Sequence, residues 1–577
     1  MACLKECKEG KLEGDPEEFT LDGSVDWHCC PAIIAKSGTW VAGNIILWNQ
    51  GLATLAFFGI GVNLVLFLAR VMGQDNADAA NNVSSWIGTA YLFSLVGAFL
   101  SDSYWGRYKT CAIFQTIFVI GLVSLSLLLD LFLIAPKGCG NESIPCGKHS
   151  ILEMGIFYLS IYLIALGNGG YQPIIATFGA DQFDEEHSKE GYSKVAFFSY
   201  FNLAFNLGQL FSNTILVYVE DKGKWALGFW VSAGSAFAAL ILFLVGTPRY
   251  RHFKPSGSPL SRICQVLVAA LWKWRAEMPS HRGDLYLMDE NESSTNGNRK
   301  VLKTQGFKFL DKAAFISSRD LEDQELGHYN PWHICPITQV EEVKCVLRLL
   351  PIWLCTIMYS MVYAQSASIF VEQGAAMKTR FSHFRIPPAS MSSFDIFSVA
   401  IFIFLYRRVL NPLTELERMG IGLVTAVMAM VSAGIVECYR LKYAKPGCSL
   451  CSGTSSLSIL WQIPQYALVG ASEVFMYVGQ LEFFNAQIPG SLKSFGSALC
   501  MASISLGNYL STLLVSLVMK ISTKDHMPGW IPGNLNKGHL DRLYFLLACL
   551  TAIDLTIYIA CAKWFKSIQH TQEKDEP

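Results

Sequence analysis

The sequence is poor in charge: only 16% of its 577 residues are Asp, Glu, Lys or Arg, whereas 52% are hydrophobic. This balance lies far from that of soluble globular proteins and excludes an ordinary soluble domain. The stretch LWNQGLATLAFFGIGVNLVLFL, residues 47–68, carries no charge at all, although it contains Asn49, Gln50 and Thr54. A membrane helix with so many polar groups and no charged one requires an explanation.

Catalytic motifs are also lacking. The chain has no GxSxG, P-loop, HExxH or Rossmann pattern, and its histidines are scattered, so we expect neither an enzyme nor a metal or cofactor site. The N-terminal residues lack the apolar core of a cleaved signal peptide, and Ala2 stands where myristoylation requires glycine. The first membrane helix is therefore expected to direct insertion, and no nucleic-acid partner is expected.

Apolar runs of the length that crosses a bilayer, about 20 residues, recur along the chain. Because helices satisfy their own backbone polar groups in lipid, these runs predict an all-α membrane protein. We expect twelve spans, six in each half, near 42–70, 83–100, 108–135, 154–178, 196–219, 225–246, 346–371, 391–406, 418–437, 457–484, 494–519 and 541–565.

A polar, basic segment separates the two halves and is expected to be cytoplasmic by the positive-inside tendency. Within it, residues 258–278 have an apolar face and predict an amphipathic helix, either lying on the membrane or packed against the bundle. Both chain ends are then cytoplasmic. The expected parts are an N-terminal segment 1–41, a first bundle 42–246, a central loop 247–340, a second bundle 341–565 and a tail 566–577.

This topology places two glycosylation sequons, at Asn82 and Asn141, in outside loops. Cys139 and Cys146 share one of these loops, so they are a possible disulfide.

Several motifs resemble known families. GAFLSDSYWGRYKT (97–110) is similar to the loop signature of the major facilitator superfamily. Five further motifs resemble the proton-coupled oligopeptide transporter family, and most closely the seventh subfamily of its plant nitrate/peptide branch. They are FGADQFDEE (178–186), FFSYFNLAFNLGQL (197–210), GFKFLDKAAF (306–315), TQVEEVKCVLRLLPIW (338–353) and VGQLEFF (478–484). The resemblance implies the major facilitator fold, in which two six-helix bundles rock about a central site to give alternating access.

The signature loop also implies a conformational latch. Asp102, Arg107 and Lys109 cannot lie in hydrocarbon, so we expect them to pair at the cytoplasmic face, with Asp181 or Asp184 as partners. The alternative is that these charges are simply solvated.

The resemblance explains the uncharged first helix. Members of the family typically carry Glu-x-x-Glu-Arg (or Lys) there, and the corresponding positions are Gln50, Ala53 and Thr54. The family's lysine of helix 4 is Gln172 here. Four charges are thus replaced, which is easily tolerated in a membrane but is expected to weaken proton coupling.

Glu473 matches the family's cavity-facing glutamate of helix 10. Without a cationic partner, burial favours its neutral form, so it is the best remaining candidate proton carrier. The alternative is a permanently neutral acid, hydrogen-bonded to Gln172, that contributes only packing. Asp395 and Glu482 are weaker candidates.

Two further positions follow from the resemblance. Tyr363 stands where the archetypal plant nitrate transporter has an anion-binding histidine; its hydroxyl can donate a hydrogen bond but supplies no positive charge, and it could equally be a packing residue. Ser103 stands where some relatives have a phosphorylatable threonine, which makes it a possible phosphosite.

The sequence therefore predicts a secondary transporter in the lipid bilayer, with the plasma membrane as the favoured location. Its cargo is a small inorganic ion or a small organic solute. Nitrate is the leading candidate, with low affinity and weak proton coupling. Its flux is expected to be bidirectional or outward, because an inside-negative potential drives uncoupled nitrate out of the cell. The alternatives are potassium/proton exchange, transport of a hormone or small peptide, and a nitrate sensor with vestigial transport.

Overall fold

A computed structural model gives the arrangement of the chain. It describes residues 20, 23–28, 30–134, 147, 149–184, 188–253, 259–274, 306–315, 332–381, 384–409, 413–444, 455–488, 493–523 and 528–574. The possible disulfide Cys139–Cys146 and the sequon at Asn141 lie outside these residues.

The first bundle contains the helices from Thr39 to Val245. They are α1 (Thr39–Gly61), α2 (Leu64–Arg70), α3 (Asn76–Leu100), η4 (Ser101–Trp105), α4 (Arg107–Leu128), η5 (Leu129–Leu133), α5 (Ile151–Ala180), α6 (Ser188–Phe211), η6 (Ser212–Leu216), α7 (Val217–Asp221) and α8 (Trp225–Val245).

The second bundle begins at Ile337. It contains α12 (Ile337–Tyr363), η11 (Ala364–Ala367), α13 (Ile369–Ala375), η12 (Pro388–Ser392), α14 (Ser393–Val409), α15 (Glu415–Lys442), η13 (Ile459–Gln462), α16 (Ile463–Glu473), η14 (Val474–Val478), α17 (Gly479–Gln487), α18 (Lys493–Ser522), η17 (Leu535–Lys537) and α19 (Leu540–Lys574). Between α13 and η12, β1 (Arg380–Phe381) and β2 (Phe384–Arg385) form a short antiparallel ribbon that the sequence did not predict.

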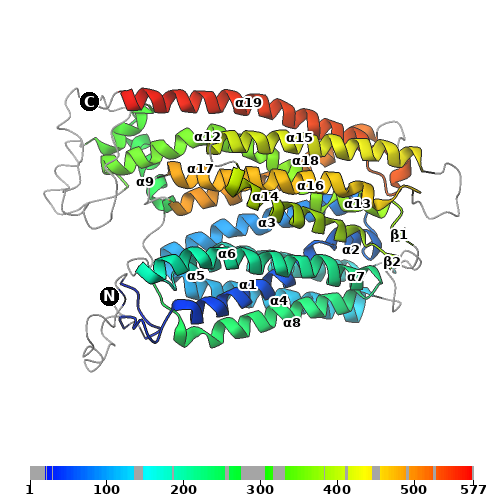
Figure 1. The fold of residues 1–577 in the computed structure, drawn as a ribbon, viewed down its shortest axis with the longest axis horizontal. Helices are drawn as coiled ribbons and strands as arrows, with labels where there is room; N and C mark the ends of the chain where they lie inside the picture. The colour runs from blue at the N-terminus through cyan, green and yellow to red at the C-terminus, as the bar shows by residue number, and fades with distance from the viewer. Residues whose placement is uncertain are drawn as a thin grey trace.

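The bundles lie side by side with their helices roughly parallel (Figure 1). Both chain ends and α9 (Pro259–Trp272) lie at one end of the molecule, whereas α7, α13 and the β1–β2 ribbon lie at the other. We call these the inner and outer ends. The fold class is confirmed: among the described residues nine helices are long and apolar enough to span a membrane. The three other predicted spans are also helical, as α6–η6–α7, α14 and α16–η14–α17.

Small residues bring the helices of the first bundle together. A Cβ on Gly97 of α3 would lie 2.4 Å from the backbone oxygen of Gly170 of α5, and one on Gly167 would lie 2.3 Å from the backbone nitrogen of Phe118 of α4. Close crossings of this kind are typical of membrane helices, which associate through packing. Gly106, with φ of +75°, provides the tight turn between η4 and α4.

Three predicted features need correction. Asn82 lies within α3 and not in a loop, and its side-chain nitrogen donates hydrogen bonds to Gln74 and Tyr158. Residues 566–574 of the predicted tail continue α19. Helix α12 begins nine residues before the predicted start of the seventh span, at Ile337 instead of residue 346.

The amphipathic helix is present as α9, which packs against η10 (Lys308–Ala314) and the start of α12. Val266 and Ala269 are buried there, while Leu271 and Trp272 on another face are exposed.

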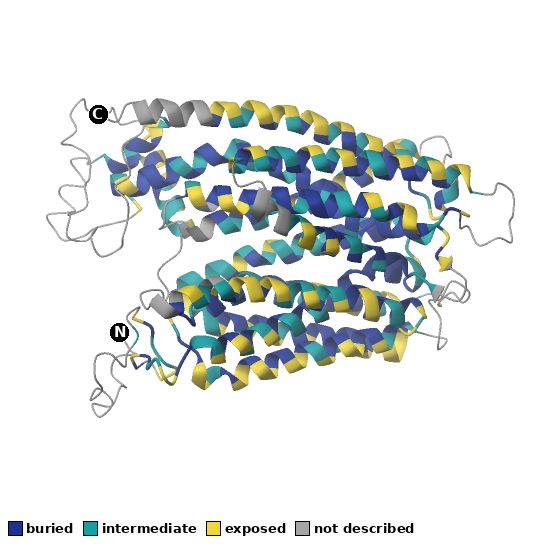
Figure 2. Cartoon of the chain, in the orientation of Figure 1, coloured by how far each residue is buried: buried dark blue, intermediate teal, exposed yellow. Residues whose placement is uncertain are grey.

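Polar side chains join the outer halves of the two bundles along α3 and α18. Ser85 bonds to Thr512 across 3.2 Å, and Thr89 bonds to Tyr509 across 2.7 Å. Figure 2 shows buried residues gathered where α2 and α13 meet at the same end. These contacts close the outer end of the molecule.

Candidate functional site

Glu473 lies at the end of α16, at the centre of a group of tyrosines. The hydroxyl of Tyr363 donates a hydrogen bond to Glu473 Oε2 across 3.1 Å. Tyr359 lies one turn earlier on α12, and its hydroxyl is 3.2 Å from Ser472 Oγ, next to Glu473. Residues four apart share one helix face, so α12 presents both phenols to the carboxylate.

A third ring completes this wall. The ring centre of Tyr477 lies 5.2 Å from that of Tyr359 and 5.4 Å from that of Tyr363, both in edge-to-face geometry. Tyr477 belongs to η14, a π-helical turn that directly follows Glu473. Such turns inside α-helices frequently occur at functional sites. Tyr91 of α3 lies within electrostatic range of Glu473, so both bundles contribute to the site.

Asp395 supplies a second carboxylate. It is buried near the start of α14, and its Oδ1 has no hydrogen-bond partner among the described residues. Helices α14 and α16 approach closely here, because a Cβ on Gly470 would lie 2.5 Å from the Asp395 backbone oxygen. Asp395 and Glu473 interact electrostatically. In the part of the chain that the structure describes, no lysine or arginine forms an ion pair with either acid.

The polar side chains of α1 form hydrogen bonds with one another and with Tyr171 of α5. The Gln50 side-chain nitrogen donates a hydrogen bond to Thr54 Oγ1 across 3.1 Å, and both residues are buried. The Tyr171 hydroxyl donates to Asn49 and lies 3.4 Å from Gln50 Oε1. These positions are thus occupied by a neutral, internally bonded network.

Gln172 does not reach Glu473. Its side chain is partly buried and makes no hydrogen bond to a described residue. The expected alternative of a Gln172–Glu473 hydrogen bond is therefore not formed in this conformation, and Tyr363 is the partner of Glu473 instead.

The signature loop lies at the inner end. Arg107 forms an ion pair with Asp181, at the C-terminal end of α5. Asp102 lies within electrostatic range of Arg107, whereas Lys109 is exposed. Asp184 is buried, and its backbone N–H donates to Glu190 Oε2 across 2.8 Å. The Arg107–Asp181 pair joins two helices of the same bundle, so it holds the inner end of that bundle together.

Comparison with known proteins shows the family. The family model described as "POT family" matches residues 108–531. The chain belongs to the POT family. It is 68% identical to Protein NRT1/PTR FAMILY 7.3 of Arabidopsis thaliana, over 100% of this chain and 96% of that protein, and 66% identical to Protein NRT1/PTR FAMILY 7.2 of the same plant, over 96% of each.

Solved structures of POT transporters share its fold. The in meso crystal structure of the POT family transporter PepTSo aligns with a TM-score of 0.67 at 21% identity, covering 92% of this chain and 99% of that one. An auto inhibited POT family peptide transporter aligns with a TM-score of 0.66 at 22% identity, covering 91% and 97%. The predicted resemblance is confirmed, and this POT-family chain is a multi-pass membrane protein and a secondary transporter.

Sequence reasoning missed a buried ion pair at the inner end of this POT transporter. Arg251 is fully buried, and its Nη1 donates to Glu190 Oε2 across 2.8 Å. Its Nη2 donates to the backbone oxygen of Ser37 across 3.1 Å, which ties the segment before α1 to the bundle. The pair joins residues 61 apart, so no local pattern signals it.

The hydroxyl of Ser103, the predicted phosphosite, is not accessible for modification in this structure. It is buried within η4 and has no hydrogen-bond partner among the described residues. Modification of Ser103 therefore requires η4 to open first.

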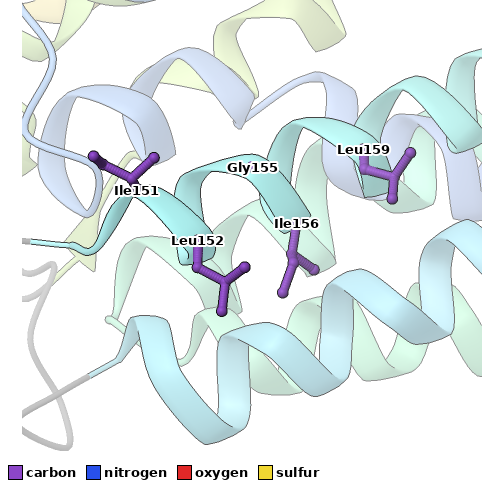
Figure 3. Close-up of a pocket in the computed structure, with 5 residues that line it drawn as sticks. All are labelled: Ile151, Leu152, Gly155, Ile156 and Leu159. Atoms are coloured by element: carbon purple, nitrogen blue, oxygen red, sulfur yellow. The ribbon is translucent and has the colours of Figure 1, made fainter.

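A shallow apolar hollow lies on the outer part of α5 of the POT chain. Figure 3 shows Ile151, Leu152, Ile156 and Leu159 projecting around Gly155. Ile151 and Leu152 are 93% and 74% exposed, which suits contact with lipid tails. The hollow carries no polar side chain and is distinct from the Glu473 site.

Proposed function

We propose that this POT transporter exchanges a monovalent cation, potassium foremost, for protons at the Glu473–Asp395 pair. One observation carries the proposal: two carboxylates lie together in a tyrosine-lined site between the bundles, with no lysine or arginine paired to either in the described chain. Whenever either acid is deprotonated, an anion would meet charge of its own sign at this site.

The chemistry of the lining groups suits a cation. Carboxylate and phenol oxygens are hard ligands of the type that alkali and alkaline-earth cations prefer, and the faces of Tyr359, Tyr363 and Tyr477 can add cation–π attraction. Glu473 and Asp395 interact electrostatically, so a negative charge on one opposes a negative charge on the other.

Exchange follows from this coupling. A cation that enters the site displaces a proton from the pair, and a proton that returns from the other side displaces the cation. Tyr363 keeps a hydrogen bond to Glu473 and holds the carboxylate toward the tyrosine wall. Rocking of the two bundles then exposes the same site to each side in turn.

Nitrate is the second candidate, as a low-affinity, bidirectional or outward flux that is weakly coupled to protons. The observation that favours it is a pair of neutral hydrogen-bond donors, the Tyr363 hydroxyl and the side-chain amide of Gln172, which makes no hydrogen bond to a described residue. With the carboxylates protonated, such donors could bind an anion, and an inside-negative potential would drive it out by about 2.3 kcal/mol per 100 mV.

The deciding experiment measures efflux of rubidium tracer, as a potassium analogue, and of labelled nitrate from preloaded, voltage-clamped oocytes at two external pH values. Cation exchange predicts rubidium efflux that rises with external proton concentration and is lost in Glu473→Gln and Asp395→Asn. The exposed Asp130, at the outer end of the third span, supplies the control Asp130→Asn.

Nitrate efflux that follows voltage and persists in Glu473→Gln would instead support the second candidate.

We propose the plasma membrane as the location, which a fluorescent fusion in plant cells would test against the vacuolar membrane.

A further inference from the structure

One carboxylate at the outer end is shared between the two bundles. Asp221, the last residue of α7, has Arg70 Nη1 at 3.1 Å from its Oδ1 and Arg385 Nε at 3.1 Å from its Oδ2. Arg70 ends α2 in the same bundle, whereas Arg385 lies on β2 in the second bundle. The Asp221 side chain is only 4% exposed, so water competes little for these pairs.

Other charged groups surround this carboxylate. Glu372 of α13 is buried and lies within electrostatic range of Arg70. Glu220, next to Asp221, is buried and accepts a hydrogen bond from Asn63 across 3.0 Å. Each side of the junction therefore contributes both an acid and an arginine, and Asp221–Arg385 is an ion pair that crosses it.

The pair lies within a longer closed seam. At the same end, Asn213 of η6 donates to Ser392 Oγ of η12 across 2.9 Å, and Asn76 of α3 donates to the backbone oxygen of Pro532 across 3.2 Å. The bundles must part here for the central site to open outward. Asp221 then loses Arg385 but keeps Arg70, so the carboxylate is not left without a cationic partner.

We propose that Asp221 and Arg385 form the outer gate of the transporter, with Arg70 as the permanent ion-pair partner that Asp221 keeps while the gate is open. The gate depends on alternating access and not on which solute is carried. The two arginines therefore have different roles: Arg385 holds the closed state, whereas Arg70 supports both states.

Hydrogen–deuterium exchange of the purified full chain tests the proposal. In Arg385→Gln we expect faster exchange in α7 and in residues 369–392, by about fivefold, which corresponds to losing a partly exposed ion pair. Arg385→Lys should largely restore protection. The matched control is Arg380→Gln, because Arg380 is the exposed cross-strand neighbour of Arg385 in the ribbon.

The variants also separate a gate from a merely structural contact. Arg385→Gln should keep the thermal midpoint of the native protein, whereas Arg70→Gln should lower it. The proposal is overturned if Arg385→Gln exchanges no faster than Arg380→Gln, or if it unfolds as readily as Arg70→Gln. Neither result bears on cation or nitrate flux, so the proposed function stands or falls separately.

Discussion

Tyr363 and Glu473, from facing helices of the second bundle, are joined by a hydrogen bond of 3.1 Å from the phenol to the carboxylate. The tyrosine occupies the position at which the resemblance implies an anion-binding histidine. In our proposal, the contact therefore links a residue that lines the site to the acid that carries the proton.

Replacing Tyr363 with histidine should move the site toward anions. An imidazole can become cationic near neutral pH, and beside Glu473 it would compete with a bound cation. We expect Tyr363→His to weaken the apparent affinity for rubidium by about tenfold, equal to about 1.4 kcal/mol. Concentration dependence of tracer flux measures this. Tyr363→Phe, which removes only the hydroxyl, is the control; an equal loss in both variants would contradict a charge effect.

The Gln50–Thr54 pair should accept charge only when both partners change together. Each residue is buried, so Gln50→Glu or Thr54→Lys alone leaves an unpaired charge, which costs about 3 kcal/mol or more. The double variant places opposite charges one turn apart and should recover much of the loss. The yield of monodisperse protein and its thermal midpoint test this. Additive losses in the double variant would show that the charges do not pair.

Gly470 should tolerate no side chain. A Cβ there would lie 2.5 Å from the Asp395 backbone oxygen and 2.6 Å from its Oδ1. We expect Gly470→Ala to destabilise the protein by about 1–3 kcal/mol, as overpacking typically does. The control is Gly155→Ala on α5, because nothing lies within 4 Å of its Cβ position. Thermal midpoints in detergent compare the two, and equal midpoints would refute the close crossing.

His252, at the inner end, should make stability depend on pH. Burial lowers its pKa from 6.5 to about 4, and Asp26 opposes the shift only partly. The unfolded chain therefore binds more protons in this window, so stability is full above pH 6.5 and is lost as pH falls toward 4. His252→Phe, which keeps a ring against Tyr108, should make the thermal midpoint depend less on pH over this range. An unchanged slope would assign the acid sensitivity to other groups.

Features carried by local pattern were predictable from the sequence. Hydropathy gave the helical spans, and the motifs gave the family, the neutral Gln50 and Thr54 positions and the candidate Glu473. The signature loop also indicated that Arg107 would pair with an acid at the end of the fourth span, which is α5, and Asp181 at that end is its partner.

Contacts between distant segments were not predictable. Arg251 meets Glu190, and Asp221 meets Arg385, only because the fold brings these distant segments together. The predicted helix ends were also inaccurate. Asn82 lies inside α3, where its side chain bonds to Gln74 of the preceding loop and to Tyr158 of α5, and hydropathy does not register such contacts. The π-turn after Glu473 has no sequence signal of its own.

The neutral α1 has an electrical consequence. When the bundles rock, a helix that carried three ionised groups would drag gating charge through the transmembrane field, at about 2.3 kcal/mol per charge per 100 mV of full traversal. Residues 39–69, which form α1 and most of α2, contain no ionisable acid or base of this kind. Movement of α1 therefore carries no side-chain charge through the field, so transient currents recorded without solute should contain no contribution from this helix.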